Sequence, residues 1–114
     1  MSSKNDRMKK ASLTLHSMIE EALQTGADSI ELEYVAEGLE VTYVFGDRGI
    51  GEIIDNRRVI SEIVRELIEQ AKLEHQSRGI LEWAYGGKSY KIHVEEHESF
   101  GESAFRLILT ESRR

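Results

Sequence analysis

The best candidate for nucleotide chemistry is Gly87-Lys88-Ser89, which has the ending of a phosphate-binding loop. That loop requires Gly-x-x-x-x-Gly-Lys-Ser/Thr, because its backbone amides wrap around the phosphates. The first glycine would fall at position 82, where this chain has Glu82. Alternating residues on both sides predict strands, whereas a phosphate-binding loop opens a helix. We therefore interpret Gly86-Gly87 as a tight hairpin turn.

Two histidines, His93 and His97, stand among glutamates and suggest a metal site. On an extended strand they would lie about 13 Å apart, at roughly 3.3 Å per residue, which is too far to share one ion unless the strand ends between them. The carboxylates of Glu95, Glu96 and Glu98 could hold only a weak hard cation. A solvated acidic segment is the favoured interpretation, and we predict no metal site.

Catalytic residues are not evident in the sequence. Ser99 and Ser103 flank Phe100-Gly101-Glu102, but the Gly-x-Ser-x-Gly arrangement of a serine hydrolase is absent. Glu31 and Glu33 share the polar side of a strand, and paired carboxylates do acid–base work only where burial separates their pKa values. We therefore predict that the chain is not an enzyme and uses no cofactor.

Aromatic residues are the best candidates for a contact surface, since interfaces are enriched in them. They are Trp83, Tyr85, Tyr90 and Phe100. Trp83 and Tyr85 share a strand face with Leu81. If the helices cover that face, these residues belong to the core, and this is the favoured interpretation. If the face is open, they mark a partner site or a homodimer interface.

Composition limits the possible partners. The chain has 114 residues, a formal net charge of −6 and no cysteine. This length predicts one domain, with residues 1–10 as a disordered polar tail and residues 11–114 as the folded part. The acidic balance argues against nucleic acid, which requires a basic face. The lack of cysteine fits a cytoplasmic location, and without a long apolar run we expect no membrane insertion.

Helical spacing of apolar residues occurs twice. The first predicted helix starts at Ala11 and ends before Gly26, which is placed as a C-terminal cap. The second follows a cap at Asp55 or Asn56 and ends near Glu74. Its apolar face consists of Ile60, Ile63, Val64, Leu67, Ile68 and Ala71.

Alternation of apolar and polar residues predicts strands over residues 29–35, 39–45 and 90–95. Three further strands are predicted over residues 50–54, 80–85 and 104–109. The polar segment 96–103 is predicted to connect the last two. Because strands joined by short turns must be antiparallel, the expected fold is α+β. It has five or six antiparallel strands in the order α-β-β-(β)-α-β-β-β, with both helices packed on one sheet face.

Several fragments follow one another in the order found in a known family. They are GADSIELE (26–33), VTYVFGD (41–47), QSRG (76–79), YKIHVE (90–95), FGE (100–102) and RLIL (106–109). In this order they resemble the PAS-like domain that precedes the motor in type II secretion and type IV pilus ATPases. The resemblance covers roughly residues 19–109, and the motor itself is absent.

The resemblance implies a domain that docks on a neighbouring motor. In the family, arginines on the strands of this domain reach the nucleotide bound to the motor. The position that matches the first is His93, and Arg106 matches the second only after a shift of one residue. Because such a shift turns a strand side chain to the other face, the family's nucleotide contact is not expected here.

Two functions follow as hypotheses. The first is a non-catalytic interaction or assembly domain that binds a motor or platform protein of secretion or pilus machinery, or a second copy of itself. Its contact residues would be Trp83, Tyr85, Phe100, His93 and Arg106. The second is a PAS-like small-molecule sensor, which requires an apolar cavity between sheet and helices. Large side chains such as Tyr34 and Trp83 are expected to fill that space.

Overall fold

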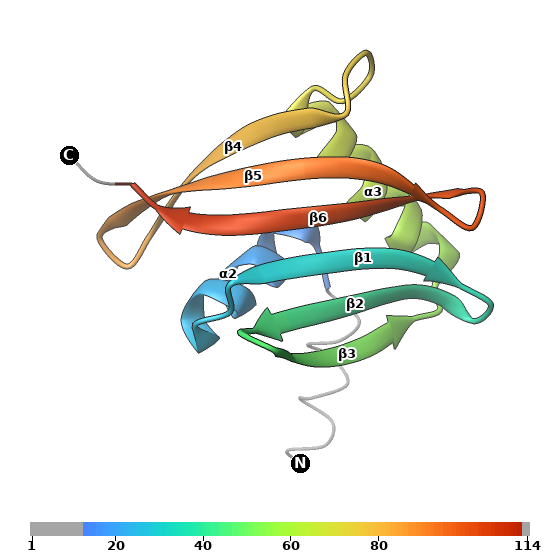
Figure 1. The fold of residues 1–114 in the computed structure, drawn as a ribbon, viewed down its shortest axis with the longest axis horizontal. Coiled ribbons are helices and arrows are strands. Elements are labelled where there is room, and N and C mark those ends of the chain that lie inside the picture. Colours follow the sequence, from blue (N-terminus) through green and yellow to red (C-terminus); the bar gives the residue numbers. More distant parts are fainter. Residues whose placement is uncertain (1–12, 113–114) are drawn as a thin grey trace.

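The computed structural model describes residues 13–112, in which two helices and six strands form an α+β domain (Figure 1). The predicted tail (residues 1–10), the expected helix start at Ala11 and the final two residues lie outside the described part. The elements are α2 (Leu15–Thr25), β1 (Ser29–Val35), β2 (Gly38–Phe45), β3 (Arg48–Ile54), α3 (Arg57–Ala71), β4 (Arg78–Tyr85), β5 (Lys88–Ser99) and β6 (Glu102–Glu111).

The six strands form one sheet in the order β3-β2-β1-β6-β5-β4. Every pairing between neighbours is antiparallel. Short turns link the strands within each half of the sheet, and α3 carries the chain from the edge strand β3 to the opposite edge strand β4 (Figure 1). The first and last strands therefore meet at the centre, where Leu32 pairs with Phe105.

Helix α2 begins at a reciprocal cap. The hydroxyl of Thr14 accepts a hydrogen bond from the Ser17 amide at 3.1 Å, and the hydroxyl of Ser17 accepts one from the Thr14 amide at 2.9 Å. Such a cap satisfies amides that the first helical turn leaves free. The helix ends at Gly26, whose φ of 83° places it in the left-handed region, as predicted.

Helix α3 begins where Asn56 Oδ1 accepts a hydrogen bond from the Val59 amide at 3.1 Å. It ends at Ala71, so the predicted end near Glu74 is wrong. The next residue, Lys72, takes a left-handed conformation with φ of 58° and stops the helix. The Leu73 amide then donates to the Ile68 carbonyl at 2.9 Å, which completes the cap.

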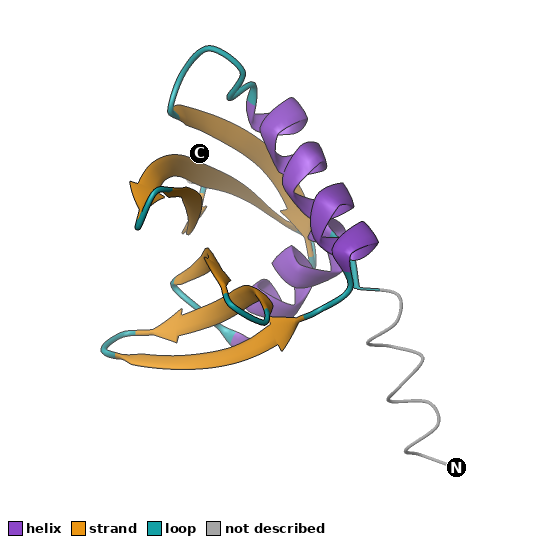
Figure 2. Cartoon of the chain, turned by 90° about the vertical axis from the view of Figure 1, so that its right-hand side faces the viewer, coloured by secondary structure: helices purple, strands orange, loops and turns teal. Residues whose placement is uncertain are grey.

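Both helices lie on the same side of the sheet (Figure 2). The apolar residues of the strands that face them are buried, among them Ile30, Val41, Ile92, Phe105 and Leu107, each at most 1% exposed. Burial of such a side chain contributes about 1.5–3 kcal/mol. The other sheet face carries mostly polar side chains and has no helix over it among the described residues. The predicted fold class is confirmed, with six strands.

The segment 96–103 is not the connection that its polarity predicted. Strand β5 continues to Ser99, β6 starts at Glu102, and only Phe100 and Gly101 form the turn. Glu96 pairs with Phe105, and the ladder continues to the turn. The prediction failed because this end of the hairpin has no fully buried face between Glu96 and Ser103, so no apolar alternation marks it as strand.

Gly79 is required where β4 passes the end of α3. A Cβ at this position would overlap the carbonyl oxygen of Ala71. Only glycine lets the two backbones approach so closely.

Within the described residues, neither helix is long and apolar enough to cross a lipid bilayer.

We expect Gly79→Ala to lower the free energy of unfolding by about 2 kcal/mol, because its methyl group meets backbone that cannot move alone. Gly51→Ala is the matched control, since a Cβ there would lie 3.3 Å from oxygens of the flexible Glu40 and Thr42 side chains. Urea denaturation of both variants measures the difference. Equal losses of stability in the two variants would show that the close approach is not the cause.

Candidate functional site

The tip of the β5–β6 hairpin exposes a large aromatic side chain. Phe100 is 100% exposed. Its φ is 54°, and that of the following Gly101 is 83°. A two-residue turn with positive φ at both central positions normally holds Asn-Gly or Gly-Gly. A phenylalanine there costs conformational energy, and its ring gains no burial within the domain in return.

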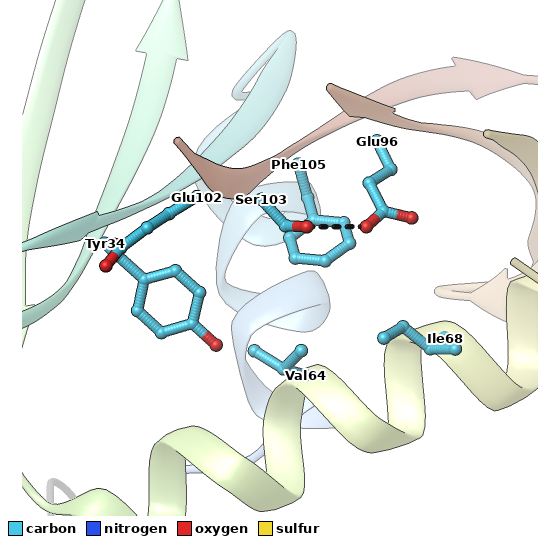
Figure 3. A pocket seen from close by; sticks show the side chains of 7 residues that line it. All are labelled: Tyr34, Val64, Ile68, Glu96, Glu102, Ser103 and Phe105. Atoms are coloured by element: carbon cyan, nitrogen blue, oxygen red, sulfur yellow. Dashed lines mark hydrogen bonds between the residues drawn. The ribbon is translucent and has the colours of Figure 1, made fainter. Parts of the chain in front are cut away.

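Two side-chain hydrogen bonds hold the end of this hairpin in place. The Ser99 hydroxyl donates to Glu33 Oε2 on β1 at 2.6 Å. The Ser103 hydroxyl donates to Glu96 Oε2 on β5 at 2.8 Å (Figure 3). Hydrogen bonds to carboxylates are stronger than those between neutral groups. The turn is therefore presented on a fixed base.

His93 and Arg106 lie together on the sheet face that the helices leave open. Arg106 on β6 pairs with Glu31 on the neighbouring strand β1 and with Glu95 on the other neighbour, β5. Its Nε lies 3.5 Å from Glu31 Oε2, and both side chains are about half exposed. Because an exposed ion pair of this kind contributes at most about 1 kcal/mol, it orients the two side chains more than it stabilises the fold. His93 is exposed beside it.

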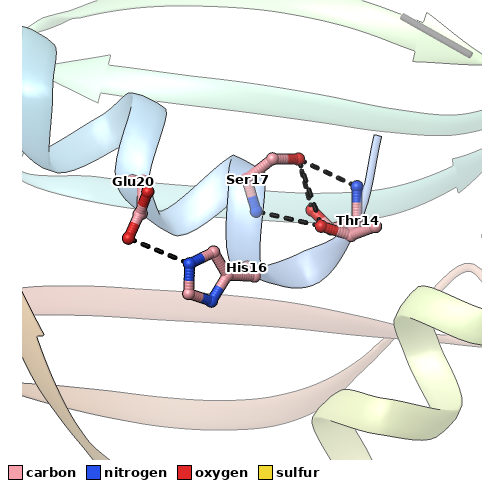
Figure 4. A network of polar contacts seen from close by, with 4 residues as sticks. All are labelled: Thr14, His16, Ser17 and Glu20. Atoms are coloured by element: carbon pink, nitrogen blue, oxygen red, sulfur yellow. Dashed lines mark hydrogen bonds and ion pairs between the residues drawn. The ribbon is translucent and has the colours of Figure 1, made fainter. Parts of the chain in front are cut away.

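Trp83 and Tyr85 lie on the opposite, helix-covered face. Trp83 is partly buried and packs against the core. Its ring lies 5.0 Å from that of His16 on α2, at an interplanar angle of 47°. His16 Nε2 in turn lies 2.9 Å from Glu20 Oε2, next to the cap of the same helix (Figure 4). The structure thus separates these two aromatics from Phe100, His93 and Arg106.

A groove of about 370 Å³ opens between α3 and the central strands (Figure 3). Phe105 lies among its lining residues, with Val64 and Ile68 on the helix side and Tyr34 on β1. Burial, with a smaller contribution from the nearby Glu102 carboxylate, raises the pKa of Tyr34 above its ordinary value of 10.0. Its hydroxyl is therefore a hydrogen-bond donor at neutral pH. The remaining polar lining is acidic or hydroxyl-bearing and consists of Glu96, Glu102 and Ser103.

The residues considered for chemistry are not brought together. Among residues 13–112, no group of three or more His, Cys, Asp or Glu side chains is placed to hold a metal ion. Strand β5 runs through both His93 and His97, which keeps them apart. Gly86 and Gly87 form the turn between β4 and β5, so no helix follows Lys88. The arrangement offers surfaces for contact.

Sequence reasoning identified Phe100 but missed the groove. The apolar stripe of α3 is wider than the part that is buried, which comprises Ile60, Ile63, Leu67 and Ala71. Val64 and Ile68 belong to the same stripe and remain half-buried along the groove. The excess width of the stripe was the available signal.

A scan against protein-family models finds no match for this chain, and a search of curated proteins finds no relative.

We expect Phe100→Asn to raise the free energy of unfolding by about 1 kcal/mol, because asparagine tolerates the left-handed conformation and no packing is lost. Phe100→Ala is the control, since it removes the ring but keeps a Cβ in the same backbone conformation. Thermal and urea unfolding measure both. If the two variants gain equally, the backbone of Phe100 is not strained.

Proposed function

We propose that the chain is a non-catalytic protein-docking domain whose anchor is Phe100 at the tip of the β5–β6 hairpin. The observation that carries the proposal is a fully exposed phenylalanine held at positive φ. Within the domain, both its exposure and its conformation are unfavourable. Aromatic residues that enter a partner's pocket are typical centres of binding energy, and binding offsets such costs.

The base of the hairpin supports this function. The hydrogen bonds of Ser99 and Ser103 fix the strands below the turn, so little conformational entropy is lost when Phe100 is bound. The nearby side chains Glu98 and Glu102 are acidic and exposed. The complementary partner surface is an apolar pocket with a basic rim.

The sequence resemblance supplies the partner class. The fragments that resemble the domain ahead of secretion and pilus motors favour a motor or platform protein of such a machine. A cytoplasmic location follows from that partner class. His93 on β5 and Arg106 on β6 lie on the open sheet face and add a polar surface on the strands that lead to the turn. In this proposal the domain contributes recognition, and the partner contributes any turnover.

The test uses calorimetry to measure binding of the full chain to the purified motor domain of a secretion or pilus ATPase from the same source. We expect Phe100→Asn to weaken binding at least tenfold, about 1.4 kcal/mol, while the fold is retained. Ile80→Asn is the matched control, because Ile80 is 51% exposed on the edge strand β4. Equal binding by the wild-type chain and Phe100→Asn would contradict the anchor role.

The groove beside α3 favours a second candidate function, small-molecule sensing. Its apolar wall of Val64, Ile68 and Phe105 and the donor hydroxyl of Tyr34 suit a compact apolar ligand with one hydrogen-bond acceptor. The acidic residues at its edge favour a neutral or cationic compound.

A thermal-shift screen with neutral and cationic apolar compounds tests this second function. A ligand that binds the folded state raises the melting temperature, and the rise grows with the logarithm of the ligand concentration once this exceeds Kd. We expect Val64→Phe to fill the groove and abolish the shift, whereas Glu62→Phe, on an exposed position of α3, should keep it. A shift that survives Val64→Phe places the ligand elsewhere.

A further inference from the structure

Among residues 13–112, no other element covers strand β3, which forms one edge of the sheet. It stands first in the strand order, and every residue from Arg48 to Ile53 is exposed. Two of these residues are large and apolar, Ile50 at 58% and Ile53 at 49% exposure. Natural edge strands are usually protected by proline, lysine or a bulge, because free backbone groups attract another strand. β3 contains no proline and no lysine.

The pairing register shows which backbone groups of β3 are free. β2 and β3 are joined by a two-residue turn closed by the pair Phe45–Arg48. Because hydrogen-bonded and free positions alternate along an antiparallel strand, Arg48, Ile50 and Glu52 bond to β2. The amides and carbonyls of the residues between them, Gly49 and Gly51, point outward. Glycine within a strand often marks a place where another backbone approaches closely.

The sequence of this edge is complementary to itself. Residues 48–52 read Arg-Gly-Ile-Gly-Glu, with a positive charge at one end and a negative charge at the other. We propose that β3 pairs antiparallel with β3 of a second copy of this chain, around a two-fold axis at Ile50. The interface is isologous, so it closes as a dimer and does not propagate into fibres.

In this register the cross-strand pairs within residues 48–52 are all favourable. Arg48 of each copy lies opposite Glu52 of the other, and Ile50 lies opposite its own symmetry mate. Gly49 and Gly51 exchange backbone hydrogen bonds. A shift by two residues in either direction loses both ion pairs and sets Ile50 against a charged residue. The charges therefore select one register.

The other edge strand, β4, begins with a similar sequence, Arg78-Gly79-Ile80-Leu81-Glu82. Its inner face is already occupied, because Gly79 lies against Ala71 of α3 and Leu81 is buried. Each backbone position that β4 leaves free carries a side chain, whereas β3 offers Gly49 and Gly51. β3 is therefore the edge better adapted to pairing, and β4 serves as the control.

The dimer is expected to be weak and concentration-dependent. A single short strand pairing buries less surface than the roughly 1,200–2,000 Å² of a stable interface. It is also compatible with docking through Phe100, because β2, β1 and β6 separate β3 from the hairpin strand β5 in the sheet. Failure of β3 to dimerise would therefore leave the proposed docking through Phe100 unaffected.

Sedimentation equilibrium of the full chain over a wide concentration range tests the proposal. We expect the mass to rise from 13.0 kDa toward double that value. Arg48→Glu alone and Glu52→Arg alone should each weaken dimerisation about tenfold or more, because each sets like charges opposite one another twice. The double variant, and an equimolar mixture of the two single variants, should restore it.

Hydrogen exchange supplies an independent measure. The amides of Gly49 and Gly51 should exchange more slowly as concentration rises, with no change in the circular dichroism spectrum. The same charge reversals at Arg78 and Glu82 on β4 should leave the mass unchanged. A monomer at every concentration, or a dimer that responds only to the β4 variants, overturns the proposal.

Discussion

The pairing of β1 with β6 is the interaction on which the fold depends. Within the described residues it is the ladder that joins the half-sheet β3-β2-β1 to the half-sheet β6-β5-β4. It sets Ile30 beside Leu107 and Leu32 beside Phe105, all at most 1% exposed. These side chains must offset the entropy of closing a chain segment that includes four strands and a helix. Both helices then pack on a sheet that this ladder has made continuous.

The same ladder explains why the hairpin projects from the sheet. Pairing between β1 and β6 stops at Glu33–Ala104, but β5 and β6 continue pairing with each other to Ser99–Glu102. Beyond this point no third strand of the described part of the chain pairs with the hairpin, and the hydrogen bond from Ser99 to Glu33 links it to β1. The domain thus has a buried centre that maintains the fold, and an exposed turn and an exposed edge strand at its periphery.

Most of the fold could be predicted from the sequence because one face of nearly every strand is buried. The alternation of Ile30, Leu32 and Tyr34 reports that burial directly. Prediction from alternation fails at residues 96–103, because their polar side chains are held by hydrogen bonds, which produce no apolar periodicity in the sequence. Of the candidate site, the identity of Phe100 was visible, but its backbone conformation was not. The width of the apolar stripe on α3 was the one signal of the groove, but its shape arises only when α3, β1 and β6 come together.

The position of β6 has a consequence for synthesis of the chain on the ribosome. This strand is made four strands and one helix later than β1, yet it pairs with β1 in the middle of the sheet. At about 5–20 residues per second, β1 can pair with β2 at once, but its other edge, at Ile30 and Leu32, waits several seconds for β6. During that interval the nascent half-sheet exposes a strand that can join to neighbouring chains. Codon usage and chaperone access over residues 36–101 therefore bear on how much of the protein reaches the folded state.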